Sequence, residues 1–170
     1  MSIVSDQDFG ELHFDGVWKG ICEMVFMGRR LEVELVVQTF DAAPISEVQR
    51  LAYREFNLNK GSISSLVEEA VFNYYLGRLE EYRECLDVDE VDVKAPRVCA
   101  FDDMQGLISL KRIKVMSAFE AGVRQIGFIF DAVFDPPPPP PPPPPPQLGI
   151  GVLVTNGSVE AVDTQDILLG

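Results

Sequence analysis

The chain has 170 residues, of which 46% are apolar, so it can bury a hydrophobic core as a single domain spanning residues 1–170 and is not disordered throughout. Its 27 acidic residues outnumber the 14 basic ones, and the formal net charge of −13 disfavours binding to nucleic acid or to an anionic membrane surface. A basic protein would be attracted instead, unless the acidity serves only solubility.

Three strand-like runs lie within residues 8–40, and turn residues separate them. Residues 9–14 precede Asp15-Gly16, a dipeptide typical of tight hairpin turns, and residues 17–27 precede Gly28. Residues 31–37 then place apolar side chains at alternate positions, which is the period of a half-buried strand. These runs predict a three-stranded antiparallel meander.

A short helix followed by a turn is predicted after the break at residues 41–44. Ser46 and Gln49 have the spacing of a capping box, and an apolar face follows them. That face consists of Val48, Leu51, Ala52 and Phe56. Residues 57–61 are interpreted as the stop and turn after this helix, with Gly61 in the left-handed conformation.

Residues 62–86 predict one long helix that the flanking strands need as a cover. Apolar residues recur at helical spacing in its first half, namely Ile63, Leu66, Val67, Ala70, Val71 and Tyr74. Ser62 and Ser65 are candidate N-caps, the latter because Glu68 follows it at capping-box spacing. At about 1.5 Å per residue the helix would be roughly 37 Å long, enough to cross a small sheet.

A charged connector and a short helix are expected after the long helix. The alternating acids of residues 87–96 fail as an EF-hand loop, because the required glycine at the sixth position and glutamate at the twelfth are missing. Asp102 or Asp103 is a candidate cap for a helix of one or two turns that reaches Ser109.

Four more strands are predicted in the last third of the chain. They cover residues 111–118, 125–134, 149–155 and 158–162, with Asn156-Gly157 as a hairpin turn between the last two. Between the second and third of them stand eleven consecutive prolines, residues 136–146. Such a run adopts a polyproline II helix and cannot lie inside a sheet, so we interpret it as an insertion in a surface loop between strands.

Strands and helices are segregated along the chain, which predicts an α+β fold. We expect a mainly antiparallel sheet of about seven strands packed against two or three helices, one of them long.

No stretch of the sequence carries a specific catalytic or metal-binding motif. His13 is the single histidine, and no GxSxG elbow supplies the serine of a Ser-His-Asp triad. Cys22, Cys85 and Cys99 have no CxxC spacing, which argues against a disulfide framework and a structural zinc site. We therefore expect no catalytic residues, no metal site and no cofactor, and an enzyme is disfavoured.

The sequence also lacks a recognisable targeting or membrane-spanning segment. The N-terminus has neither a basic start nor an apolar run of signal-peptide length, and the most apolar window, residues 126–134, is too short to span a bilayer. An odd number of cysteines suits a reducing compartment. We therefore expect a cytoplasmic protein.

Carboxylates are the one abundant polar group, and they gather on the long helix and the connector after it. Tyrosines on the same helix could serve as aromatic anchors for a partner, with core packing as their alternative role. The candidate partner-binding residues are Glu68, Glu69, Tyr75, Glu80, Glu81, Tyr82, Glu84, Asp87, Asp89 and Glu90. The alternative interpretation is an ordinary solvated helix face.

Several turn and packing residues together resemble a known family. They are Phe9-Gly10, Gly16, Trp18, Gly20, Ile45-Ser46, Gln49, Tyr53, Tyr74-Tyr75, Gly149, Gly151, Asn156-Gly157 and Gln165-Asp166. In this pattern the chain is similar to a family of uncharacterised small bacterial α+β domains, some of which are thought to be immunity proteins of polymorphic toxin systems. The resemblance implies no catalytic residues.

Charge and resemblance together favour a non-enzymatic binding protein, an immunity-type inhibitor that binds a basic toxin or another basic protein through an acidic surface. One alternative is a small enzyme of unknown substrate that uses paired carboxylates. Another is an adaptor whose proline run is read by an aromatic-lined groove, although basic residues that would orient such a ligand do not flank the run.

Replacing residues 136–146 with a short Gly/Asn turn is expected to leave the protein folded, with its melting temperature changed by only a few degrees. The reason is that the entropy of loop closure depends only logarithmically on loop length. Thermal unfolding followed by circular dichroism measures this. Loss of a cooperative transition would show that the proline run packs on the domain, and loss of a partner by the folded variant would favour the adaptor.

Overall fold

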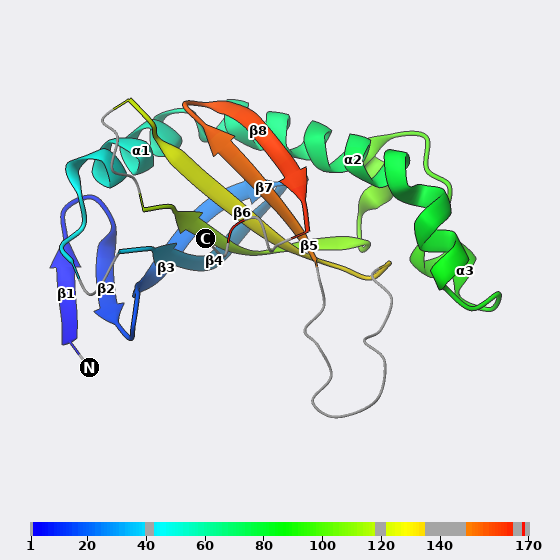
Figure 1. Cartoon of the computed structure of the whole chain (residues 1–170), viewed down its shortest axis with the longest axis horizontal. Coiled ribbons are helices and arrows are strands. Elements are labelled where there is room, and N and C mark those ends of the chain that lie inside the picture. Colours follow the sequence, from blue (N-terminus) through cyan, green and yellow to red (C-terminus); the bar gives the residue numbers. More distant parts are fainter. Residues whose placement is uncertain (1, 40–42, 118–121, 135–148, 165–167, 169–170) are drawn as a thin grey trace.

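One eight-stranded sheet forms the body of the protein, as Figure 1 shows for the computed structural model, which describes residues 2–39, 43–117, 122–134, 149–164 and 168. The strands are β1 (Ser2–Asp6), β2 (Gly10–Phe14), β3 (Trp18–Phe26), β4 (Arg29–Val37), β5 (Ile108–Val115), β6 (Gln125–Ala132), β7 (Ile150–Thr155) and β8 (Ser158–Asp163). Their order in the sheet follows their order in the chain. All neighbours are antiparallel except β4 and β5, which are parallel because a helical crossover joins them.

The helices lie between β4 and β5 in sequence, and the two longer ones cover one face of the sheet (Figure 1). They are α1 (Glu47–Leu58), α2 (Lys60–Cys85), the single-turn α3 (Val91–Lys94) and the 3-10 helix η1 (Phe101–Met104). The predicted α+β fold with a mainly antiparallel sheet and one long helix is confirmed. The strand count is one higher than expected, because β1 pairs with β2.

The core fills the space between the sheet and the two longer helices, and aromatic rings dominate it. Phe56 of α1 lies edge-on to Phe128 of β6, with ring centroids 5.8 Å apart. Phe26 of β3 contacts Phe130 of β6 at 5.1 Å, so the two halves of the sheet share one core. Burial of such rings stabilises the fold and fixes the helices over the sheet.

Two hairpin turns have the same backbone conformation, which Asn-Gly favours and which Met-Gly adopts with a methionine at positive φ. Asn156 and Gly157, with φ of 51° and 83°, connect β7 to β8 as predicted. Met27 and Gly28 join β3 to β4 with φ of 54° and 74°. Positive φ at both central residues is the type I′ pattern, whose twist matches that of the flanking strands.

The capping box at the start of α1 is confirmed. Ser46 Oγ accepts a hydrogen bond from the Gln49 backbone N–H at 3.1 Å, and Gln49 Oε1 accepts from the Ser46 N–H at 3.0 Å. Gln49 is buried and its amide also donates to the Gln38 carbonyl, at 2.5 Å, which ties α1 to the end of β4. The predicted apolar face was partly wrong, because Leu51 is 42% exposed and Tyr53 is buried instead.

The junction of α1 and α2 differs from the prediction. Gly61 is helical rather than left-handed, and α2 begins at Lys60, immediately after Asn59. Neither predicted serine caps the helix, since both lie inside it and Ser65 Oγ donates to the Gly61 carbonyl of its own helix. The buried side of α2 consists of Ile63, Ser64, Val67, Val71, Tyr75 and Leu79, whereas Leu66 is 42% exposed.

A row of polar side chains on α2 covers an edge of β3 that has no strand beside it. β2 pairs with β3 only at His13 with Lys19 and Phe14 with Trp18, so most of β3 lacks a strand on that side among the described residues.

Three side chains of α2, each four residues from the next, bond to this edge. Lys60 Nζ donates to the Glu23 carbonyl, Ser64 Oγ donates to the Val25 carbonyl at 2.8 Å, and Glu68 Oε1 accepts from the Met27 N–H at 2.8 Å. Four helical residues rise about 6 Å and two strand residues about 6.6 Å, so every fourth residue of α2 lies beside every second residue of β3. We call the three residues the α2 polar row.

The segment between α3 and β5 is less helical than expected. The predicted helix through Ser109 is only η1, and β5 already begins at Ile108. Asp103 accepts hydrogen bonds from the backbone N–H groups of Cys99 and Ala100, both at 3.2 Å, from inside the 3-10 helix. The expected pairing of the two following strands, β5 and β6, is confirmed.

The proline run, residues 136–146, falls between β6 and β7 and lies outside the described residues, so its place in a surface loop stays a prediction. Within the described part of the chain, no helix is both long enough and apolar enough to span a bilayer.

Replacing Ser64 with alanine is expected to lower the free energy of unfolding by about 1–2 kcal/mol, because it leaves the Val25 carbonyl without its hydrogen-bond donor. Ser65→Ala is the matched control, since the exposed Ser65 hydroxyl bonds only within α2 and alanine favours helices. Urea denaturation of both variants measures the difference. Equal effects would mean that the α2 polar row does not stabilise the fold.

Candidate protein-binding surface

The end of α2 and the segment after it extend beyond the strands, at the right of Figure 1. We call residues 80–94 the acidic projection, because they hold seven acidic and two basic residues. Most of the acidic residues proposed from the sequence lie here. The projection is therefore the part of the described chain where the predicted acidic surface is concentrated.

The chain after α2 folds back on the helix, and side chains of α2 donate hydrogen bonds to the backbone of this following segment. Arg83 donates to the Ala95 carbonyl at 2.7 Å and to Asp92 Oδ1 at 2.9 Å. The Tyr75 hydroxyl donates to the Pro96 carbonyl at 2.7 Å. The Asp87 carbonyl accepts from the N–H groups that begin α3. These contacts hold the projection in one conformation against α2.

The tyrosines proposed as anchors pack mainly inside the protein. Tyr75 is fully buried against Phe134, at 4.8 Å between ring centroids, and burial raises its pKa to about 12. The prediction that Tyr75 contacts a partner is therefore wrong, because the ring fills the core and its hydroxyl is hydrogen-bonded. Tyr82 is half-buried and lies against Tyr75 and Phe134, at 6.2 Å and 4.6 Å.

Several of the predicted carboxylates have partners within the chain. Glu80 forms an ion pair with Arg97 at 2.6 Å, and the hydrogen bond from that guanidinium lowers the pKa of Glu80. Glu90 pairs with Lys94 at 3.2 Å. Glu68 belongs to the α2 polar row and bonds to the turn after β3. These side chains are already engaged and offer less charge to a partner.

The remaining predicted carboxylates are exposed and have no ion pair among the described residues. Glu81, Glu84, Asp87 and Asp89 lie together on the acidic projection. Glu69 is also exposed, but it precedes Glu81 by twelve residues, about 18 Å along the helix. The structure therefore brings four of the ten predicted residues together as unpaired charges and separates Glu69 from them.

Two valines that were not proposed from the sequence are exposed on the projection. Val88 is 90% exposed and Val93 is 74% exposed. Val88 lies between Asp87 and Asp89, in the turn that precedes α3. The signal in the sequence was the alternation of valines with acids at residues 87–93, a pattern without a continuous apolar face that could reach the core. These valines replace the tyrosines as apolar groups that a partner could cover.

A depression on the uncovered face of the sheet holds other ionisable groups, including His13, Glu32 and Glu34. Glu34 is paired with Arg112 at 2.9 Å. No hydrogen bond or ion pair within the described chain joins His13 to either glutamate, so a proton-transfer pair is not formed. Lys114 on the same face is buried and donates to the Leu168 carbonyl, and burial lowers its pKa.

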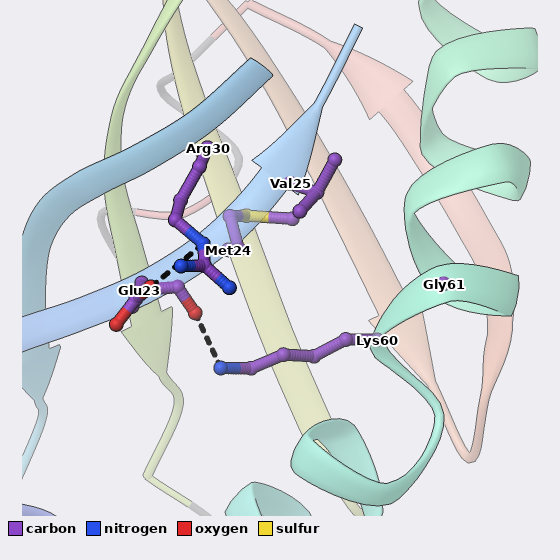
Figure 2. Close-up of a pocket in the computed structure, with 6 residues that line it drawn as sticks. All are labelled: Glu23, Met24, Val25, Arg30, Lys60 and Gly61. Carbon is purple, nitrogen blue, oxygen red and sulfur yellow. Dashed lines mark hydrogen bonds and ion pairs between the residues drawn. The ribbon is translucent and has the colours of Figure 1, made fainter. Parts of the chain in front are cut away.

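A cleft of about 320 Å³ lies where α2 begins beside β3, as Figure 2 shows. Arg30 pairs with the Glu23 carboxylate at 3.0 Å, and Lys60 donates to the Glu23 carbonyl. Its charged groups thus bond to one another and to the strand. We interpret this cleft as part of the contact between α2 and β3 rather than as a ligand site.

A partly buried ionic cluster connects the β1–β2 hairpin to α1. Arg54 binds both oxygens of Asp8, at 2.7 and 3.0 Å, and Arg50 bridges Asp6 and Asp8 at 2.9 and 3.0 Å. The carboxylate side chains are only 12% and 11% exposed. The hydrogen bond from Arg54 lowers the pKa of Asp8, and that from Arg50 lowers the pKa of Asp6. The cluster is fully paired, which indicates a structural role.

No group of three or more His, Cys, Asp or Glu side chains in the described part of the chain is placed to hold a metal ion.

The fold and the surface together define an α+β domain with one helix-covered sheet and an acidic extension of its long helix. A family model described as a domain of unknown function (DUF6985) matches residues 8–136, which run from the turn before β2 to the first residue of the proline run, and the chain belongs to that family. No curated protein and no solved structure matches the chain.

Replacing Asp8 with asparagine is expected to lower the free energy of unfolding by about 2 kcal/mol at neutral pH, because it removes a nearly buried charge that two arginines bind. The folded-state pKa of Asp8 is lowered, so its stabilisation is complete above the unfolded-state pKa of about 4. That stabilisation is lost as the pH falls through the folded-state pKa.

Urea denaturation at neutral pH and below about pH 4 therefore should show the difference between wild type and Asp8→Asn shrinking in acid. Glu47→Gln is the control, because the exposed Glu47 lies 3.5 Å from Arg54 and contributes little. A gap between wild type and Asp8→Asn that is the same at both pH values would contradict the assignment.

Proposed function

We propose that this protein is a non-enzymatic binding protein that docks on a basic protein through the acidic projection. The observation that carries the proposal is the combination of four exposed, unpaired carboxylates with the exposed side chains of Val88 and Val93. An exposed apolar group supplies affinity when a partner covers it, and charge around it selects the partner and speeds encounter.

The internal contacts of the projection support this proposal. Arg83, Lys94 and Arg97 are engaged by acids or backbone carbonyls of the same region, so the chain's own cations neutralise only part of the surface. The hydrogen bonds from Arg83 and Tyr75 fix the backbone before a partner arrives. A preformed surface binds with a smaller loss of conformational entropy than a flexible acidic tail would.

An inhibitor of the immunity type is the specific form of this function that we propose. A toxin that acts on nucleic acid needs a basic surface to hold its substrate, and an acidic protein can occupy that surface. The resemblance found in the sequence points the same way. Such an inhibitor would work in the cytoplasm, where the three cysteines, none of which forms a disulfide, would stay reduced.

Reversing the charge of Glu81, Glu84 and Asp89 to lysine is expected to slow association with a basic partner about tenfold or more at low salt, and to flatten its salt dependence. Val88→Ala is expected mainly to speed dissociation, because it removes apolar contact without changing charge. The measurement is binding kinetics against the product of the adjacent gene at several salt concentrations.

Glu11, Glu69 and Asp102 changed to lysine together form the matched control, since they are exposed acids without an ion pair in the described part of the chain. The control variant has the same net charge as the test variant. Equal slowing by the two variants would show a diffuse charge effect, and no slowing by the test variant would exclude the projection as the docking site.

A further inference from the structure

A second gap in the sheet separates the first halves of β4 and β5. The pairing of these parallel strands covers only Glu34 to Val37 with Arg112 to Val115. Before that point the strands diverge toward their N-terminal ends (Figure 1), and β4 from Arg29 to Val33 has no strand on this side among the described residues.

The backbone groups that face this gap can be assigned from hydrogen bonds further along the strands. Gln38 N–H donates to the Val115 carbonyl, so the even-numbered residues of β4 direct their N–H and C=O groups toward β5. Those in the gap are Arg30 and Glu32. The α2 polar row serves the unpaired edge of β3, but no described side chain bonds to the backbone of Arg30 or Glu32.

A groove of about 170 Å³ opens at this gap, beside the turn between β3 and β4. Its apolar lining includes Phe26, Met27, Leu31, Ile108 and Leu110. Since a water molecule occupies about 30 Å³ in the liquid, the groove has room for an apolar side chain or two. The gap thus offers both unpaired backbone and an apolar pocket, the two features that strand-adding domains present to peptides.

The charge of the groove is opposite to that of the protein as a whole. The chain has 27 acidic residues, yet none lines the groove, whereas Arg29 does. Arg29 is exposed and forms no ion pair in the described part of the chain. A carboxylate on the bound segment would therefore meet a cation at the rim.

We propose that this groove binds an extended apolar segment of a partner protein that carries a carboxylate, by strand addition to the first half of β4. The backbone of the segment bonds to Arg30 and Glu32, alternate apolar side chains enter the groove, and the carboxylate pairs with Arg29. The site is separate from the acidic projection and binds an acidic segment, whereas the projection binds a basic partner. The two proposals can therefore be tested independently.

The test uses the full chain and a panel of fluorescein-labelled hexapeptides with apolar residues at alternate positions and aspartate at one end. A matched panel ends in lysine. Fluorescence anisotropy is expected to show saturable binding of aspartate peptides, at least about tenfold tighter than their lysine counterparts. Methylating the backbone nitrogens that face β4 should weaken binding by a similar factor, because it removes the donors.

Arg29→Glu should weaken binding of the aspartate peptides about tenfold or more, and Lys94→Glu is the control. Lys94→Glu makes the same change of charge on the acidic projection, where Lys94 pairs with Glu90 and does not line the groove. Both side chains lie at the surface, so neither change disturbs the core. Amide chemical shifts that move at β4 and the start of β5 would locate the peptide.

Three results would overturn the proposal. The first is that no member of the panel binds at millimolar concentration, and the second is equal binding of the methylated peptides. The third is a dimer, seen by sedimentation, that Arg29→Glu dissociates, which would make a second copy of the chain the occupant. Charge reversal on the acidic projection should leave peptide binding unchanged, so failure of either proposal can be recognised separately.

Discussion

The contact of the α2 polar row with β3 is the interaction on which the arrangement of the sheet depends. A strand edge facing protein must have its N–H and C=O groups bonded, because an unpaired buried backbone group costs about 1–3 kcal/mol. β2 leaves β3 after two residue pairs, and Lys60, Ser64 and Glu68 then take the place of a neighbouring strand. The helix thus acts both as a cover for the core and as an edge partner.

This contact also explains how one helix can hold both halves of the sheet. α2 bonds to β3 in its first half and also contacts β7 and β8, and Arg78 in its second half reaches Asp163 of β8 at 3.8 Å. The parallel pairing of β4 and β5, which joins the two halves of the sheet, extends over four residue pairs. The helix therefore compensates for a short ladder at the centre of the sheet, and the unpaired part of that ladder becomes the groove beside Arg29.

Local signals in the sequence predicted the elements that local physics determines. The capping box of Ser46 and Gln49, the type I′ turn at Asn156-Gly157 and the long helix all follow from side chains within a few residues. β1 was missed, because its five residues show no clear alternation and its pairing is fixed by Asp6 and Asp8 binding to α1. Gly61 was misread as a turn because tertiary contacts of Lys60 and Ser64 extend α2 through it.

The binding surface was harder to predict, because the sequence gives the number of charged residues but does not show which of them form ion pairs or hydrogen bonds within the protein. The stretch from Glu68 to Glu90 holds eight acids and two arginines in sequence, yet Glu68, Glu80 and Glu90 bond within the protein. The burial of a single tyrosine likewise cannot be predicted from the sequence, since Tyr75 and Leu76 are adjacent on α2 and only Tyr75 is buried.

The net charge of −13 therefore overstates the charge that any one partner could meet. Asp6 and Asp8 form ion pairs with arginines of α1, Glu34 pairs with Arg112, and Glu55 pairs with Arg124. A partner near the surface responds to charges within about one Debye length, 8–10 Å at physiological ionic strength. What distinguishes the acidic projection is thus its local surplus of unpaired carboxylates around exposed valines, a property of position that the composition alone cannot reveal.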